Sequence, residues 1–274
     1  MNLLVTRPEP QASEWAQRLS QAGVAAQALP LIAIEAPPDG VAVERLWRTL
    51  PEHRALMFVS PAAVSWFFRL RPAGLAWPQA CLACAPGPGT AQALLEAGAA
   101  HGLTDAHIVS PAHDAPQFDS EALWPLLAPL DWRDQNVAIV SGGDAQSARG
   151  RQWLSEQWRA QGARIEAIQA YQRSAGRWDE AQQRLALAAL TQPQRHTWLL
   201  SSSQALDFLL DVHLPAFVPA LVPACVPAHS DPQDMQLLCT HPRIAEHALA
   251  RGLRHIAQCA PTLQAVVQAR RSSP

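Results

Sequence analysis

The stretch Leu56-Met57-Phe58-Val59-Ser60-Pro61 indicates the fold class of this chain. Its apolar run has the length and character of a buried strand, and Ser with Pro then opens an amphipathic segment with helical periodicity. A strand that passes directly into a helix is the repeating unit of parallel sheets. The stretch therefore predicts a βα junction at Ser60.

The same pattern recurs along the whole chain. A short apolar run followed by Thr or Ser with Pro or Gly stands at residues 3–8 and 137–143, and less regular examples follow the same logic. Eight such junctions imply mostly parallel sheet covered by helices. The remaining five lie at residues 82–90, 108–111, 198–203, 237–242 and 256–262.

The spacing of the junctions decides between a closed barrel and two open sheets. Two gaps are long, and each contains an extended segment without a Ser/Thr turn at its end, at residues 25–38 and 163–176. Both segments exceed the about 5 to 6 residues of a usual strand and end in Pro or Gly. We interpret them as paired crossings between two domains.

The predicted fold is therefore α/β, with two open parallel-sheet domains of flavodoxin-like or Rossmann-like type joined by a two-stranded linker. The length of 274 residues fits two domains at about 150 residues each. The first domain is discontinuous, with residues 1–35 and 174–274, and the second spans residues 36–173. The crossings are expected near residues 30–38 and 166–176.

Composition excludes several classes of protein. With 49% hydrophobic and 16% charged residues the chain is globular, and a net charge of −2 argues against partners that are nucleic acid or anionic membrane. All 21 basic residues are arginine, which excludes lysine Schiff-base chemistry and a P-loop lysine. Five sparse cysteines, no signal peptide and no apolar run of about 18 residues predict a cytoplasmic protein.

The junctions also suggest the kind of ligand. Each places backbone N–H groups at a helix N-terminus, outside the carboxyl end of a strand, where anions are favoured. A single junction of this kind more often serves only to cap its helix. Two domains that faced each other would line a cleft with such sites, and the number of junctions favours a ligand with many negative charges. Arginines beside the junctions could bind carboxylates, although each alone more often is a solvated surface charge: Arg7, Arg149, Arg151 and Arg243.

Tyr171 is the single tyrosine of the chain and lies in the second crossing segment. A phenol, with an ordinary pKa of about 10, can donate a proton to a departing hydroxyl at neutral pH. The alternative interpretation is an aromatic side chain that packs the hinge.

Other motifs give weaker signals. Cys81 and Cys84 have C-x-x-C spacing without a second pair, so we interpret them as part of a strand. Gly87-Pro88-Gly89 lacks the third glycine of a dinucleotide fingerprint, and neither H-E-x-x-H nor G-x-S-x-G occurs. The proline-rich stretch 214–232 is expected to be an extended surface loop rather than an ordinary helix.

Taken together and in order, the motifs resemble those of the uroporphyrinogen-III synthase family of tetrapyrrole biosynthesis. The opening V-T-R-P, the central S-G-G and the Y-Q-R of the second crossing are the most specific. The motifs that carry the resemblance are Leu4–Pro8, Phe58–Val64, Pro86–Ala91, Ser141–Gly143, Ala170–Arg173, Leu200–Ser202 and Pro242–Ala245.

The resemblance implies the substrate hydroxymethylbilane, a linear tetrapyrrole with eight carboxylates, and no cofactor or metal. In the family, loss of the ring A hydroxyl gives an azafulvene, closure onto ring D gives a spiro intermediate, and ring D emerges inverted. Tyr171 aligns with the tyrosine proposed to assist departure of the hydroxyl. The expected substrate-binding residues are Thr6, Arg7, Ser60, Pro61, Gly87, Thr90, Ser141, Gly142, Gly143, Arg149, Ser201, Ser202, Thr240 and Arg243.

The chain departs from the family pattern at Thr240-His241-Pro242-Arg243, where a Gly-Pro-Thr-like turn is expected. The amide-lined turn there is expected to be altered, with Arg243 a candidate for direct contact with a carboxylate. We expect a monomer. Two alternatives stay open at this point: a two-domain sensor that binds a polyanionic small molecule without chemistry, and a sugar-phosphate enzyme on a similar scaffold.

Overall fold

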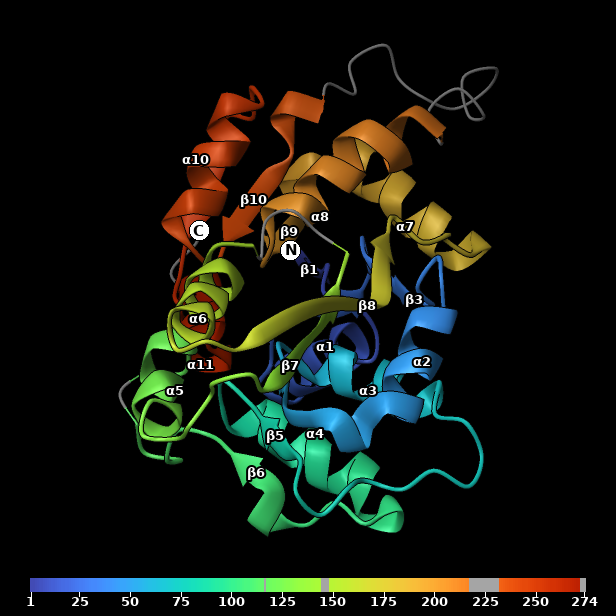
Figure 1. Cartoon of the computed structure of the whole chain (residues 1–274). Helices are drawn as coiled ribbons and strands as arrows, with labels where there is room; N and C mark the ends of the chain where they lie inside the picture. Colours follow the sequence, from blue (N-terminus) through green and yellow to red (C-terminus); the bar gives the residue numbers. More distant parts are fainter. Residues whose placement is uncertain (116, 144–147, 217–231, 272–274) are drawn as a thin grey trace. The chain divides into compact units, whose positions relative to one another are not determined.

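Every apolar run that precedes a predicted junction forms a β-strand (Figure 1). The structure is a computed structural model, and it describes residues 1–115, 117–143, 148–216 and 232–271. All eight of these strands pair in parallel with at least one neighbour. They lie in two open sheets, which confirms the predicted fold class and excludes the barrel.

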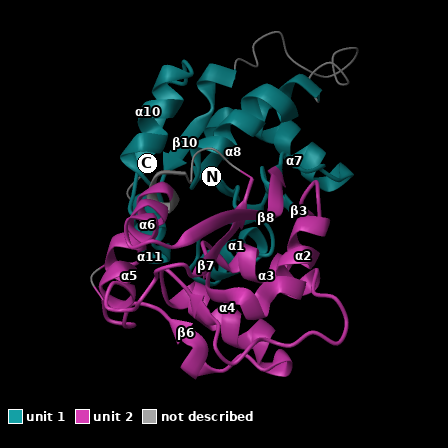
Figure 2. Ribbon diagram, viewed as in Figure 1, with its two compact units in different colours: residues 1–34, 174–274 teal, residues 35–173 magenta. Residues whose placement is uncertain are grey.

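The chain divides into two compact units, residues 1–34 with 174–274 (unit 1) and residues 35–173 (unit 2), shown in Figure 2. The chain leaves unit 1 within β3 (Ala33–Glu35) and returns at the end of β8 (Arg164–Ser174). These two strands are neighbours in one sheet. That each unit folds as an independent domain, with the boundaries given above for 1–35, 36–173 and 174–274, stays a prediction.

The sheet of unit 1 has five strands in the order β11-β10-β9-β1-β2. Numbered along unit 1 alone, this is the order 2-1-3-4-5 of flavodoxin-like folds. Because the direction of winding reverses after the first strand, a switch point lies between β1 and β9. The strands are β1 (Asn2–Val5), β2 (Ala26–Ala28), β9 (His196–Leu200), β10 (Gln236–Cys239) and β11 (His255–Gln258).

Helices cover both faces of the unit 1 sheet. Successive side chains of β1 point to opposite faces, so Leu3 and Val5 enter one apolar cluster and Leu4 another. The first cluster includes residues of α1 (Gln11–Gln21) and α11 (Leu263–Arg271). The second includes residues of α7 (Glu180–Thr191), α8 (Ser203–Phe208) and α10 (Pro242–Ala250). Two short helices, η4 (Pro193–Arg195) and η6 (Pro232–Asp234), directly precede β9 and β10.

The sheet of unit 2 has six strands in the order β3-β8-β7-β4-β5-β6. If β3 is left out, the five other strands, β4 to β8, can be numbered 1 to 5 along the chain. Read from β6 to β8 their order in the sheet is then 3-2-1-4-5, so that the first of them, β4, is central as in a Rossmann fold. Its switch point lies between β4 and β7. The strands not yet bounded are β4 (His53–Phe58), β5 (Leu82–Cys84), β6 (Ile108–Val109) and β7 (Asn136–Gly142).

Two different cores cover the two faces of this sheet. One is built by α5 (Ser120–Leu127) and α6 (Ala148–Ala160), whose Leu127 and Trp158 pack on Met57 and Ile139. The other is aromatic: Trp47 stacks on Phe67 and its Nε1 donates to the Phe67 carbonyl at 2.9 Å. This aromatic core joins α2 (Val41–Thr49) to α3 (Pro61–Arg69). Helix α4 (Pro88–Gly98) packs beside α3. Three short helices lie in the connections of this unit: η1 (Leu50–Glu52), η2 (Ala99–His101) and η3 (Asp105–His107).

The two predicted crossing segments differ in form. Residues 25–38 contain two strands of three residues, β2 and β3, instead of one long strand. Pro30, which lies between them, has no N–H for a sheet ladder, and its carbonyl accepts a hydrogen bond from Trp178 Nε1 at 2.9 Å. In the second segment, β8 runs unbroken for 11 residues and is longer than a usual strand, as the sequence predicts.

The proline-rich stretch is only partly described, because residues 217–231 lie outside the described ranges. After α8 the chain forms a π-helical turn, η5 (Leu209–His213), and residues 214–216 continue as helix. The expectation of an extended loop is therefore wrong for its first three residues. The π-turn interrupts the regular hydrogen-bond ladder of the helix just before Pro215, the residue whose missing N–H could not continue that ladder.

His213 at the end of η5 is buried and gives the fold a specific dependence on pH. Its ring stacks on Trp178 with 4.1 Å between centroids, and Nε2 lies 3.4 Å from the Leu31 carbonyl oxygen. Burial lowers the pKa of His213 from its ordinary value of 6.5. The imidazole of His213 therefore takes up a proton more readily in the unfolded chain than in the folded chain. As pH falls below about 6.5, protonation favours the unfolded state, and the stability that the neutral ring contributes is lost.

We therefore expect His213→Gln to reduce the loss of unfolding free energy between pH 7 and pH 5. Urea denaturation at several pH values measures this, with the exposed His255→Gln as the control that keeps the wild-type slope. Equal slopes for wild type and His213→Gln would show that His213 does not supply the dependence.

Candidate active site

The switch point of unit 2 brings together the residues with the strongest predicted chemistry. Ligands of open α/β sheets bind outside the carboxyl ends of the strands at such a point. Ser60 follows β4, Ser141 and Gly142 end β7, and Tyr171 lies in β8 on the other side of β7. The structure thus places these four predicted residues on three neighbouring strands.

Ser60 connects a helix terminus with the phenol. It is the N-cap of α3, with extended backbone, and its Oγ accepts from the Ala63 N–H at 3.2 Å. The same Oγ lies 3.3 Å from the Tyr171 hydroxyl. Pro61 occupies the first turn of α3, where its missing N–H costs no helical hydrogen bond.

A β-bulge turns Tyr171 toward this helix terminus. Ser141 pairs with Gln169, but Gly142 pairs with Tyr171, so one extra residue of β8 is inserted at this step. Such an insertion reverses the alternation of side chains between the faces of the sheet. The amide of Gly143 donates to the Tyr171 carbonyl at 3.0 Å and holds the bulged end of β8 against β7.

The two glycines leave the space that the neighbouring side chains occupy. A Cβ on Gly142 would lie 2.4 Å from Tyr171 Cζ, and a Cβ on Gly143 would lie 2.2 Å from Gln169 Nε2. Tyr171 is 2% exposed, which agrees with the packing interpretation of this residue. The Arg173 guanidinium lies 6.0 Å from the centre of the phenol ring.

The switch point of unit 1 carries a second group of predicted residues. Thr6 and Arg7 follow β1, and Ser201 and Ser202 follow the adjacent strand β9. Thr6 is buried, and its hydroxyl donates to the Leu199 carbonyl at 2.6 Å, which ties the loop after β1 to β9. Ser202 is the N-cap of α8 without a side-chain cap hydrogen bond.

Removing the Thr6 hydroxyl should measure how much this hydrogen bond between the loop after β1 and strand β9 contributes to stability. We expect Thr6→Val to lower the free energy of unfolding by about 1 to 2 kcal/mol, because a buried carbonyl loses its partner. Thr49→Val is the control: its half-buried hydroxyl bonds only to carbonyls of its own helix, and we expect a change within about 0.5 kcal/mol. A Thr6→Val protein as stable as wild type in denaturant titration would contradict this role of the hydroxyl.

Arg7 is held by an aromatic residue that the sequence analysis missed. Its guanidinium carbon lies 4.1 Å from the centre of the Trp15 ring, on α1. The Nε atom is buried without a hydrogen-bond partner, and burial lowers the pKa of Arg7. An unsatisfied donor at a strand end is a position at which an acceptor such as a carboxylate would gain a hydrogen bond. No pattern in the sequence assigns Trp15 to Arg7.

The remaining predicted residues lie in, or directly before, the helices that follow neighbouring strands of the same sheets. In unit 2, Gly87 is the N-cap of α4 and Thr90 is buried in that helix. In unit 1, Thr240 is buried after β10, and Arg243 is exposed in the first turn of α10. Arg149 belongs to α6, but its side chain lies outside the described part of the chain.

Not every predicted helix-terminal amide is available to a ligand. The Ala63 amide is taken by Ser60, and the Arg243 amide donates to His241 Nδ1 at 3.1 Å. His241 is the N-cap of α10, so the unusual turn at residues 240–243 is capped by an imidazole. At these two positions the structure shows the capping role that the sequence analysis gave for a single junction, because the side-chain caps satisfy the same donors.

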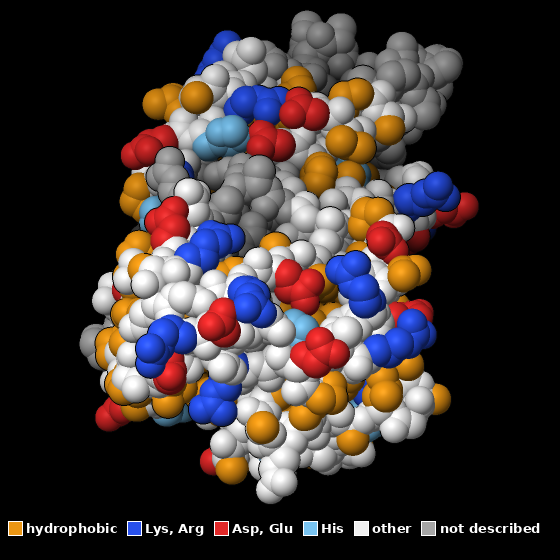
Figure 3. Space-filling model, viewed as in Figure 1, with side chains coloured by type: hydrophobic (Ala, Val, Ile, Leu, Met, Phe, Trp, Pro, Cys, Tyr) orange, Lys and Arg blue, Asp and Glu red, His pale blue; other side chains and the backbone are white. Residues whose placement is uncertain are grey.

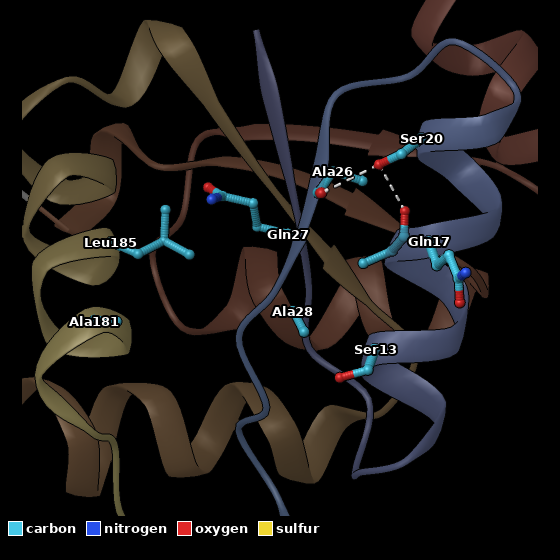
Figure 4. Close-up of a pocket in the computed structure, with 9 residues that line it drawn as sticks. Ser13, Gln17, Ser20, Ala26, Gln27, Ala28, Ala181 and Leu185 are labelled. Carbon is cyan, nitrogen blue, oxygen red and sulfur yellow. Dashed lines mark hydrogen bonds between the residues drawn. The ribbon is translucent and has the colours of Figure 1, made fainter.

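Two surface pockets of unit 1 lie away from the predicted residues. One, of about 430 Å³, is lined by Ser13, Gln17 and Ser20 of α1, by β2, and by Ala181 and Leu185 of α7 (Figure 4). None of its lining residues carries a charge. The other, of about 270 Å³, lies beside Pro30 and Gly176. Neither pocket contains a residue predicted to bind substrate.

The cysteines and histidines offer no metal site among the residues that the structure describes. Cys81 and Cys84 are buried free thiols; burial raises the pKa of Cys81 to about 12 and that of Cys84 further. Both are therefore protonated at neutral pH, and both are buried in the core. Cys84 ends β5 as predicted, whereas Cys81 directly precedes this strand. Within the described ranges, no helix is long and apolar enough to cross a membrane.

Comparison with known proteins decides the family. The family model described as uroporphyrinogen-III synthase HemD matches residues 13–268. The chain belongs to the uroporphyrinogen-III synthase family. The uroporphyrinogen-III synthase of Salmonella typhimurium is 29% identical over 184 residues, which cover 67% of this chain and 69% of that protein.

Solved structures of two synthases share the fold. A mutant uroporphyrinogen III synthase from the extremely thermophilic bacterium Thermus thermophilus has a TM-score of 0.52 at 15% identity, covering 98% of this chain and 96% of that one. The uroporphyrinogen-III synthetase from Helicobacter pylori has a TM-score of 0.55 at 13% identity, with 99% and 98% covered. As a member of this family the chain is an enzyme, a cyclising lyase of tetrapyrrole biosynthesis.

Proposed function

We propose that the chain closes hydroxymethylbilane to uroporphyrinogen III, with Tyr171 as the proton donor to the departing hydroxyl. The contact between Ser60 and Tyr171 at the unit 2 switch point carries this proposal, because it places the one phenol of the chain beside a helix N-terminus. As the C–O bond breaks, the phenol proton leaves in the water that forms. The lone pair of the pyrrole nitrogen delocalises to the exocyclic carbon and gives the N-protonated azafulvene cation, whose charge balances the phenolate. Return of the pyrrole N–H proton to the phenolate gives the neutral azafulvene and restores the phenol.

Burial of the phenol restricts when it can act. Because Tyr171 is 2% exposed, the substrate must displace the groups that cover its hydroxyl before the proton can move. Burial also keeps bulk water from the hydroxyl until then, and electrostatic stabilisation is stronger where water is excluded. The burial of Tyr171 therefore agrees both with a packing role and with a proton donor whose hydroxyl becomes accessible only when the substrate binds.

Local contacts must hold the carboxylates of the substrate, since the chain has little net charge. On the face that Figure 3 shows, positive and negative side chains are interspersed. Arg7 is the best supported carboxylate ligand in the described structure, because Trp15 orients its guanidinium and Nε has no protein partner. Thr240, Arg243, Gly87, Thr90, Ser201 and Ser202 are proposed to contribute from the adjoining strand ends.

The proposal also covers the setting of the enzyme. It acts as a monomer in the cytoplasm on a small-molecule substrate, without nucleic acid, membrane or cofactor. The low net charge supports the absence of a polyanionic macromolecular partner.

Complementation tests the function in a cell. A bacterial strain whose own uroporphyrinogen-III synthase has been deleted should regain growth without added haem when it expresses this chain. The same chain with Tyr171→Phe, at equal abundance, should restore growth weakly. No growth with the abundant, folded wild-type chain would contradict the proposed function and favour a protein that only binds polyanions.

A further inference from the structure

We propose that Ser60 is a positioning residue for Tyr171: its hydroxyl donates to the phenol oxygen as that oxygen gives up its proton. This inference rests on the proposed function, since it assumes that Tyr171 is the proton donor. It assigns Ser60 a role through Tyr171 instead of the direct contact with substrate that the sequence predicts.

The hydrogen bonds around Ser60 run in one direction once Tyr171 has lost its proton. The Ala63 N–H donates to Ser60 Oγ at 3.2 Å, and this oxygen lies 3.3 Å from Tyr171 Oη. While the phenol is neutral, either hydroxyl can be the donor of the second bond. Once Tyr171 has transferred its proton, only Ser60 has a proton left to donate. The bond is therefore stronger after proton transfer than before it, and such an interaction lowers the barrier.

The helix behind Ser60 strengthens this effect. Helix α3 is nine residues long and has no acidic residue in its first turn, so no carboxylate there offsets the positive end of its dipole. The hydrogen bond from Ala63 polarises the Ser60 hydroxyl and makes it a better donor. Negative charge on the phenol oxygen is thus stabilised through Ser60.

Gly142 keeps the phenol in place for this bond. The backbone of Gly142 lies where a Cβ would come within 2.5 Å of Tyr171 Cε2. With Gly142 on one side and Ser60 at the hydroxyl, the ring cannot turn away from α3 without losing its packing. The Arg173 guanidinium, 6.0 Å from the ring centre, places a positive charge near the same ring.

Ser60→Ala should lower kcat roughly 10-fold or more and change KM less than about 2-fold. The variant lacks the hydrogen bond that stabilises the charged phenol oxygen, and this bond gains its strength only as the proton is transferred, not when the substrate binds. Ser60→Thr keeps both the hydroxyl and a good helix cap, and should retain kcat within about 3-fold.

The cap of α3 is lost together with the hydroxyl, so a matched cap variant is needed. Asp119 caps α5 in the same unit, where Oδ1 accepts from the Ala122 N–H at 2.8 Å, and no hydrogen bond joins it to Tyr171 in the described structure. We expect Asp119→Ala and Ser60→Ala to lower Tm by comparable amounts. Only Ser60→Ala should lower kcat; an equal loss in both variants would overturn the proposal.

A double-mutant cycle separates this inference from the function on which it rests. In a Tyr171→Phe background, Ser60→Ala should lower kcat less than about 2-fold further, because the oxygen that it serves is gone. An undiminished effect there would show that Ser60 acts only through the structure of α3. If Tyr171→Phe lowers kcat but Ser60→Ala does not, the role of Ser60 alone is contradicted; if Tyr171→Phe keeps full kcat, the proposed role of Tyr171 fails.

Discussion

Tyr171→Phe is expected to lower kcat about 100-fold or more, while KM changes only slightly. Removal of a general acid typically costs this much, and the lost proton donor acts in the transition state, not in binding. The substitution removes one oxygen and keeps the ring that packs against Gly142. Steady-state kinetics with hydroxymethylbilane measure both constants.

Thr197→Val is a matched control for the loss of a buried hydroxyl. Thr197 is 5% exposed in β9 of unit 1, and its hydroxyl accepts from Arg270 at 3.3 Å. We expect this variant to lose some stability and to keep kcat. A Tyr171→Phe enzyme with wild-type kcat would leave the phenol with a packing role only.

Gly142→Ala is expected to have the largest combined effect on stability and turnover. The added Cβ would lie 2.4 Å from Tyr171 Cζ and 2.9 Å from its hydroxyl oxygen, so the ring or the bulged strand must move. Overpacking of this kind costs about 1 to 3 kcal/mol of unfolding free energy. Because the moved phenol loses its alignment with the departing hydroxyl as well as its contact with Ser60, we also expect kcat to fall about 100-fold.

Gly89→Ala provides the control for a glycine near a helix N-terminus of the same unit. A Cβ there meets no atom within 4 Å, and alanine favours the helical backbone by about 0.5 to 1 kcal/mol. This variant should be at least as stable as wild type in thermal denaturation and equally active. If Gly142→Ala also keeps both properties, the close packing of Tyr171 on the β7 backbone does not matter for catalysis.

The junction pattern was sufficient to predict the fold class because each strand and its helix cap are encoded locally. Ser60 with Pro61 specifies the start of α3 regardless of the rest of the chain. After β1 the junction is looser, because α1 begins only at Gln11, with Pro10 and not Thr6 at its N-cap. The order of the strands is a different matter. It depends on contacts between residues far apart in sequence, such as Leu4 beside Trp198, and no local pattern states them.

The site was predictable as a set of strand ends, but its internal contacts were not. The bulge that pairs Gly142 with Tyr171 inserts one residue into β8, and the sequence Ala170-Tyr171-Gln172 carries no mark of it. The glycines at 142 and 143 were a signal of close approach, yet they do not say which side chain approaches. Likewise, the aromatic support of Arg7 by Trp15 depends on how α1 docks on the sheet.

The isomer of the product tests the central claim most directly. Purified chain is mixed with freshly generated hydroxymethylbilane, and the oxidised products are separated into the type I and type III isomers. The account predicts type III in large excess, formed faster than spontaneous closure. Type I alone, at the rate seen without protein, would contradict it.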